Sequence, residues 1–191
     1  MPQIPGTNAI VFNPLLPRSS RFASFALEAA NGKQSAYAKL SPMICWLSVV
    51  EAARLAGSIS DAAAAAISQS TRREYWSPFV PFDTETALTH EQLLNLPTGS
   101  FIAFLATPLG GEVNPEQGLV LAHAMVYLGE GRAVGSNNGV IDGRPDWSVM
   151  DLRTLPWGTT GGNFSFALGP RKFVVRYRNI EDTQRRDCII M

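Results

Sequence analysis

The chain has little of what several protein classes require. It contains two cysteines and two histidines among 191 residues, too few for a disulfide scaffold, and a four-ligand zinc site would need all of them. We therefore expect neither a metal nor another cofactor. No apolar run approaches the roughly 18 residues of a spanning helix, and a secretory signal peptide is not expected at the N-terminus. Basic and acidic residues number 16 each, so nucleic acid is not an expected partner.

The composition is that of one globular domain of ordinary size, with 46% hydrophobic and 17% charged residues. Residues 1–20 contain four prolines and little periodicity, which predicts a flexible N-terminal lead. Residues 21–180 are expected to form the folded, catalytic domain. Residues 181–191 are interpreted as a C-terminal tail.

Three helices are predicted in the first 70 residues. Apolar spacing predicts a short helix over 21–30. Ser41 as N-cap and Pro42 at the first helical position predict a stronger helix that carries the apolar run 43–56. A third helix is predicted over 58–70, where an alanine run favours helix.

Strand patterns dominate after residue 99, preceded by one helical turn over 90–95 with Thr89 and Gln92 as a capping box. His90 in that turn is expected to be solvated and is not assigned to a site. Strands are predicted over 101–106, 118–129, 132–137, 164–168 and 172–178, with a tight hairpin turn between the second and third. Helices followed by an antiparallel sheet predict an α+β fold.

Cys45 is the first candidate for chemistry. A thiol in the first turn of a helix faces unpaired backbone N–H groups and the positive end of the helix dipole, and both favour the thiolate. The backbone N–H of Cys45 could also stabilise an oxyanion that forms beside the sulfur. The alternative interpretation is a small buried hydrophobic residue.

His123 is the candidate base. It lies in an apolar strand, where strict alternation places it on one face with Leu121, Met125 and Tyr127. An imidazole at that position could accept the proton of a nearby thiol. A satisfied core histidine is the alternative.

The hairpin register suggests a third residue. If residues 130–131 form the two-residue turn, His123 stands opposite Asn138, whose amide oxygen could orient the imidazole. A change of one residue in the turn would favour Asn137 or Ser136 instead.

In their order and spacing, these residues resemble the papain-like cysteine peptidase superfamily: a cysteine that opens a helix before a tryptophan, a histidine in a strand, and an asparagine 15 residues later. The stretches LPTGSFIAFLA and AHAMVYLGEG are also similar to the sheet of NlpC-type cell-wall endopeptidases. The resemblance covers roughly residues 40–140. It implies a papain-like fold, with the nucleophile at a helix start packed on an antiparallel sheet. Cys45 would be the nucleophile, His123 the base and then the acid, and Asn138 or Asn137 the orienting residue.

The chain departs from both patterns. Where the papain pattern has an oxyanion-donating glutamine, this chain has Lys39, and the nearest glutamine is Gln34, so the second oxyanion donor is not identified. Gly135 occupies the place of the third polar residue of the NlpC pattern. The resemblance is therefore closer to bacterial effector proteases and deamidases of similar fold. The alternatives for the third residue are Asp142, Asp146 and Asp151.

The chain ends in Cys188-Ile189-Ile190-Met191, which fits the box for farnesylation of Cys188. If the box is used, a host prenyltransferase is a partner, and the lipidated tail reaches a membrane surface with help from nearby basic residues. The alternative is a tail strand in which Cys188 packs. Prenyl transfer takes place in the eukaryotic cytosol. A papain-like core without a signal peptide that carries this box resembles a bacterial effector delivered into a host cell, at the cytosolic face of host membranes.

Together these features predict a cysteine-dependent hydrolase, either a protease or an amide deamidase, that uses a Cys-His-Asn triad on a host protein at a membrane. One alternative is a peptidoglycan amidase or endopeptidase toxin. Another is a non-catalytic prenylated binding module on a degenerate peptidase scaffold. A eukaryotic cytosolic enzyme is a further reading of the lipidation box.

Overall fold

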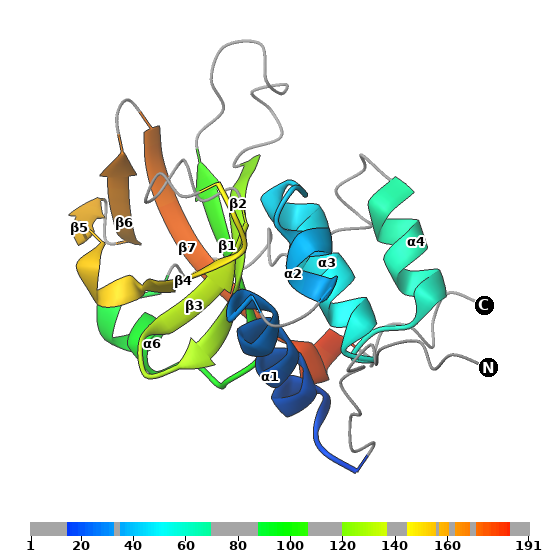
Figure 1. The fold of residues 1–191 in the computed structure, drawn as a ribbon. Coiled ribbons are helices and arrows are strands. Elements are labelled where there is room, and N and C mark those ends of the chain that lie inside the picture. The colour runs from blue at the N-terminus through cyan, green and yellow to red at the C-terminus, as the bar shows by residue number, and fades with distance from the viewer. Residues whose placement is uncertain are drawn as a thin grey trace, which may run out of the picture.

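The computed structural model describes residues 15–32, 35–69, 88–106, 120–136, 145–155, 157–160, 163–168 and 171–183. Helices come first, and one antiparallel sheet of seven strands follows, in the order β4-β3-β2-β1-β7-β6-β5 (Figure 1). The predicted α+β class is confirmed. The sheet consists of two meanders that share β1 at its centre.

The helices are α1 (Arg18–Ala30), α2 (Ser35–Leu40), α3 (Cys45–Leu55), α4 (Asp61–Gln69) and α6 (His90–Leu94), with short 3-10 helices η3 (Leu152–Thr154) and η4 (Ile180–Thr183). The strands are β1 (Ser100–Ala106), β2 (Val120–Gly129), β3 (Arg132–Gly135), β4 (Ser148–Asp151), β5 (Trp157–Thr160), β6 (Asn163–Leu168) and β7 (Arg171–Asn179). The sequence pattern did not predict α2, β4 or β5. Helix α1 begins at Arg18, so it includes the last residues of the predicted N-terminal lead.

The predicted N-cap of the central helix was wrong. Helix α3 begins at Cys45 and its N-cap is Ile44, which makes no side-chain capping hydrogen bond. Ser41 lies in the turn before it, where its hydroxyl accepts a hydrogen bond from the backbone N–H of Trp147 at 3.3 Å. A tertiary contact therefore occupies the side chain that local sequence assigned to the cap.

The third helix also begins later than predicted. Ser60 caps it, because its hydroxyl accepts a hydrogen bond from the N–H of Ala63 at 3.1 Å. Ser58 is instead buried and donates to the carbonyl of Arg18 at 2.9 Å. In contrast, the capping box of Thr89 and Gln92 at the start of α6 is confirmed.

Two apolar clusters cover the two faces of the sheet. The first joins α1, α3 and α4 to alternate residues of the sheet, including Phe101, Ala103, Leu105, Ala124 and Val126. The second lies on the opposite face, with α6, and includes Ile102, Phe104, Met125, Tyr127 and Phe173. Figure 1 shows helices α1 to α4 gathered on one side of the sheet and α6 on the other. Cys45 packs against the first cluster.

A β-bulge interrupts the alternation of β2. Phe104 pairs with His123 whereas Leu105 pairs with Leu121, so Ala122 is the extra residue. Because of this insertion, Leu121 packs against the helix-side cluster and Ala122 against the opposite one. The predicted alternation was correct for Met125 and Tyr127 but wrong for Leu121.

The β2–β3 hairpin closes as predicted, with Gly129 paired to Arg132. Gly129, Glu130 and Gly131 all have positive φ, as expected for a tight turn. The register then shifts by one residue, so Val126 pairs with Val134.

Candidate functional site

The sequence predicted Cys45 in the first turn of a helix that begins at Pro42. Helix α3 begins three residues later, so Cys45 is its first residue. The preceding Ile44 is extended, with φ −62° and ψ 151°, and its side chain is 56% exposed. Cys45 itself is half-buried. The thiol therefore lies at the border between the apolar core and the surface, beside the uncapped N–H groups of the first turn.

The acidity of this thiol differs from the expectation. Burial raises the pKa of Cys45 above the ordinary thiol value, and this effect outweighs the backbone hydrogen bonds from Ala124, Trp46 and Cys45 itself, which lower it. The prediction that the helix start favours the thiolate was therefore right about these local groups and wrong about the net direction. At neutral pH the resting thiol keeps its proton.

His123 is fully buried in β2. It pairs with Phe104 of β1, and the two rings lie with centroids 5.7 Å apart. Directly paired residues share a face of the sheet, so the imidazole lies on the Phe104 side, whereas α3 covers the other side.

The Cys45 sulfur nevertheless contacts the peptide group that joins His123 to Ala124. The backbone of Ala124 hydrogen-bonds to the sulfur, and only its N–H can lower the pKa of a thiol in this way. That nitrogen is bonded to the carbonyl carbon of His123. The sulfur thus lies beside the backbone that carries the imidazole, on a sheet where these residues are 78 positions apart in sequence.

The orienting residue stays a prediction. Asn137 and Asn138 lie outside the described residues, as does Asp142. The prediction of Asn138 counted pairs from Gly129 and Arg132. Because the register shifts by one residue in the hairpin, the same count from the pair of Val126 and Val134 predicts Asn137 as the partner of His123.

Ser136, the third candidate from the hairpin, has another role. Its hydroxyl lies 2.7 Å from the carbonyl oxygen of Met43 and 2.7 Å from the hydroxyl of Ser48, which in turn lies 2.9 Å from the carbonyl oxygen of Cys45. Both serines are fully buried. Sequence reasoning missed Ser48, although a serine inside the apolar run 43–56 was a signal.

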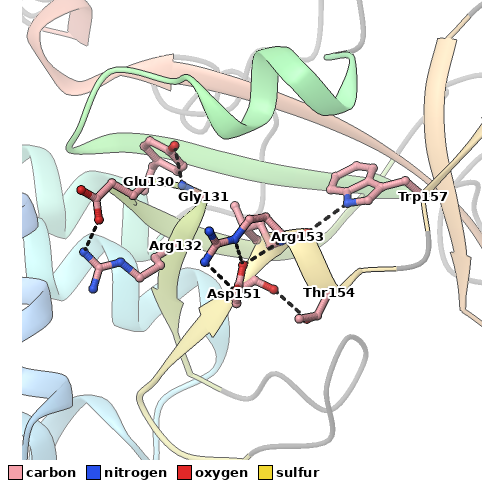
Figure 2. Close-up of polar contacts among 9 residues, drawn as sticks. Glu130, Gly131, Arg132, Asp151, Arg153, Thr154 and Trp157 are labelled. Carbon is pink, nitrogen blue, oxygen red and sulfur yellow. Dashed lines mark hydrogen bonds and ion pairs between the residues drawn. The ribbon is translucent and has the colours of Figure 1, made fainter.

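Asp146 and Asp151, the two alternative third residues that the structure describes, interact with other side chains. Asp146 accepts a hydrogen bond from the hydroxyl of Tyr37 at 2.8 Å. Asp151 caps η3 and binds the guanidinium of Arg153 at 2.8 Å through each oxygen (Figure 2). Asp151 pairs with Arg132 at the hairpin, which is about 20 Å along β2 from His123 at roughly 3.3 Å per residue.

Lys39, which the sequence resemblance aligned with an oxyanion-donating glutamine, forms an ion pair with Glu51 of α3. Its ammonium group is therefore directed to the body of the helix. Gln34 and Cys188 lie outside the described residues. The second oxyanion donor is not assigned.

His90 is half-buried and stacks on the indole of Trp157, with ring centroids 5.0 Å apart. This contact belongs to the face of the sheet that α6 covers, away from Cys45. Its exclusion from the site therefore stands, although the expectation of a solvated side chain was wrong.

Among the described residues, no group of three or more His, Cys, Asp and Glu side chains could hold a metal ion. Within the same residues, no helix is long and apolar enough to cross a membrane. The chain matches no family model, no curated protein and no solved structure.

Proposed function

We propose that this protein is a thiol-dependent hydrolase, a protease or an amide deamidase, with Cys45 as nucleophile and His123 as base. The observation that carries the proposal is the meeting of the Cys45 sulfur with the backbone between His123 and Ala124. A papain-like arrangement requires a helix-start cysteine beside a strand histidine, and these two segments are far apart in the sequence.

The ring geometry supports a role for one nitrogen in particular. Nδ1 is the imidazole nitrogen nearest the main chain, and the sulfur lies against that main chain. In the proposed reaction Nδ1 takes the thiol proton, which requires the ring to turn from the Phe104 face of the sheet toward the sulfur. Nε2 extends farther from the backbone and is the atom that an orienting amide, from Asn137 or Asn138, would hold.

The proposed reaction begins with attack of the Cys45 sulfur on an amide carbonyl carbon while the thiol proton passes to His123. The oxyanion forms beside the N–H groups of the first turn of α3, which have no side-chain cap. The carbon–nitrogen bond then breaks, and the leaving amine or ammonia takes the proton from His123. Water hydrolyses the thioester and regenerates the thiol.

The surroundings of the thiol favour a protein substrate. Ile44, next to the nucleophile, presents an apolar side chain that is 56% exposed. Such a side chain can pack against an apolar residue of a bound polypeptide, and burial of that contact removes water from the reacting groups.

The test is product profiling in a eukaryotic cell lysate. Wild-type protein should generate new protein termini, for a protease, or convert an amide to an acid, for a deamidase. Cys45→Ala should abolish the products, and His123→Gln should reduce their rate by roughly 10²–10⁴, the usual contribution of a general base. Because the chain contains only two cysteines and two histidines, Cys188→Ser and His90→Gln are matched controls that should retain activity in a lysate.

The competing candidate is a non-catalytic binding scaffold. The observations that favour it are the complete burial of His123 and the raised pKa of Cys45. Products that persist in Cys45→Ala would reject the hydrolase. Wild-type protein that binds a lysate protein without altering it, equally well with Cys45→Ala, would favour the scaffold.

A further inference from the structure

Two buried hydroxyls join the start of α3 to the end of β3. Ser136 follows β3 and Ser48 lies one turn into α3, and their side-chain oxygens are 2.7 Å apart. Both side chains are 0% exposed in an otherwise apolar cluster that includes Val49 and Val134. Buried hydroxyls cost free energy unless they are hydrogen-bonded, so their bonds decide where these two segments can sit.

The bonds converge on the residues around Cys45. Ser136 reaches the carbonyl oxygen of Met43 at 2.7 Å, and Ser48 reaches the carbonyl oxygen of Cys45 at 2.9 Å. One carbonyl lies two residues before the nucleophile and the other belongs to it. The pair therefore holds the backbone on both sides of Ile44, which is the N-cap of α3.

Planar peptide geometry extends this control to the N–H groups. In a trans peptide the C=O and N–H bonds point in opposite directions. A Met43 carbonyl held inward by Ser136 turns the N–H of Ile44 away from the core. A Cys45 carbonyl held along the helix keeps the N–H of Trp46 directed to the helix start, where it hydrogen-bonds to the sulfur.

The register of the sheet fixes the other side of the contact. Strand β3 pairs with β2, and the pair of Val126 and Val134 lies two residues from both Ala124 and Ser136. Ser136 therefore ties α3 to the strand pair at the level of Ala124, whose backbone also contacts the thiol. The hydrogen bonds of Ser136 and the contact between Ala124 and the thiol thus both fix the distance between α3 and β2.

Building on the proposed role of Cys45 as nucleophile, we propose that Ser136 and Ser48 are positioning residues that hold the thiol against the His123–Ala124 peptide. Ser136 is the more important of the two. Its loss frees the Met43 carbonyl and separates β3 from α3, whereas loss of Ser48 frees only the Cys45 carbonyl and should change the thiol pKa in the same direction by less.

The experiment measures the thiol directly and requires no substrate. In full-length protein that carries Cys188→Ser, Cys45 is the single thiol, and the pH dependence of its alkylation by iodoacetamide gives its pKa. Burial raises this pKa more than the N–H groups of Ala124 and Trp46 lower it, so release of the helix start toward water should lower the thiol pKa. We expect Ser136→Ala to increase the thiolate fraction at pH 8 by about threefold or more, since one pKa unit is tenfold.

Ser58→Ala is the matched control. Ser58 is 1% exposed and its hydroxyl also donates to a backbone carbonyl, that of Arg18, at 2.9 Å. It should lower the melting temperature to a similar extent without changing the pKa of Cys45. Ser136→Thr, which keeps the hydroxyl, should retain the wild-type pKa.

Several results would overturn the proposal. One is an unchanged thiol pKa in Ser136→Ala, and another is an equal change in Ser58→Ala or in Ser136→Thr. If Ser136→Ala does not fold, Ser48→Ala decides, because alanine favours helix, and a pKa that does not move there contradicts the positioning role. A protein without hydrolase activity that still shows these pKa changes would refute the proposed function and leave the positioning role intact.

Discussion

Glu51 of α3 contributes one carboxylate to an ion-pair network that links three helices, and acid should weaken that network. Its side chain is 14% exposed and binds Arg54, one turn along α3, at 2.7 Å. It also pairs with Lys39 of α2, and Arg54 reaches Asp61 of α4 at 2.9 Å. The hydrogen bond from Arg54, together with the one from Lys39, lowers the pKa of Glu51 from 4.5 to about 2.

The two pKa values set the direction and the size of the effect. Between about 2 and 4.5, the unfolded chain binds a proton at Glu51 that the folded chain does not bind, so stability is full above this range and falls as the pH is lowered through it. The difference corresponds to roughly 3 kcal/mol in the free energy of unfolding, of which about 2 kcal/mol is lost by pH 3. Because water screens the partly exposed cations, we expect a loss of about 1–2 kcal/mol.

Urea unfolding at pH 7 and pH 3 measures this loss. Glu51→Gln should be less stable than wild type at pH 7, and the two proteins should converge toward pH 3. Asp61→Asn is the matched control: it removes a carboxylate that is 87% exposed from the same Arg54 and should change stability little at either pH. A stability difference between wild type and Glu51→Gln that is the same at both pH values would refute the reasoning.

The remaining predictions concern packing and location. Gly99→Ala should destabilise the fold far more than Gly32→Ala in thermal melts, because a Cβ at Gly99 would lie 2.2 Å from a carbonyl oxygen of α1, whereas nothing lies within 4 Å at Gly32. Both have positive φ, so equal losses would contradict the close approach. Trp147→Phe should lower the free energy of unfolding in urea by roughly 1–3 kcal/mol, because the buried indole donates to the carbonyl of Ala26 at 2.9 Å; no loss would show that this bond contributes nothing. Cys188→Ser should move the protein from membranes to cytosol in fractionated eukaryotic cells, and an unchanged membrane fraction would argue against lipidation.

Features fixed by neighbouring residues could be predicted from the sequence. Thr89 and Gln92 form their capping box because both partners lie within one turn. The pairing of Gly129 with Arg132 follows from the residues that a tight turn accepts. Ser41, Pro42 and the apolar run 43–56 predicted Cys45 in the first turn of a helix, but the helix begins at Cys45 itself and the predicted cap was wrong.

Features fixed by distant contacts could not be predicted. The local sequence predicted Ser41 as an N-cap, but its hydroxyl accepts a hydrogen bond from the backbone N–H of Trp147, far along the chain. The bulge at Ala122 carries no local signal, because its backbone departs from the register only through pairing with β1. The direction in which the pKa of Cys45 shifts could not be predicted either, since burial depends on how the whole of α3 packs on the sheet.

The raised pKa of Cys45 determines how the proposed chemistry would operate. A thiol that keeps its proton at neutral pH cannot attack until a base removes that proton. The resting site would therefore hold a neutral thiol. Charge would appear only as the sulfur attacks, when the N–H groups at the start of α3 can stabilise the oxyanion. Such a site should react slowly with small alkylating agents and quickly with a substrate that fills the space beside Ile44.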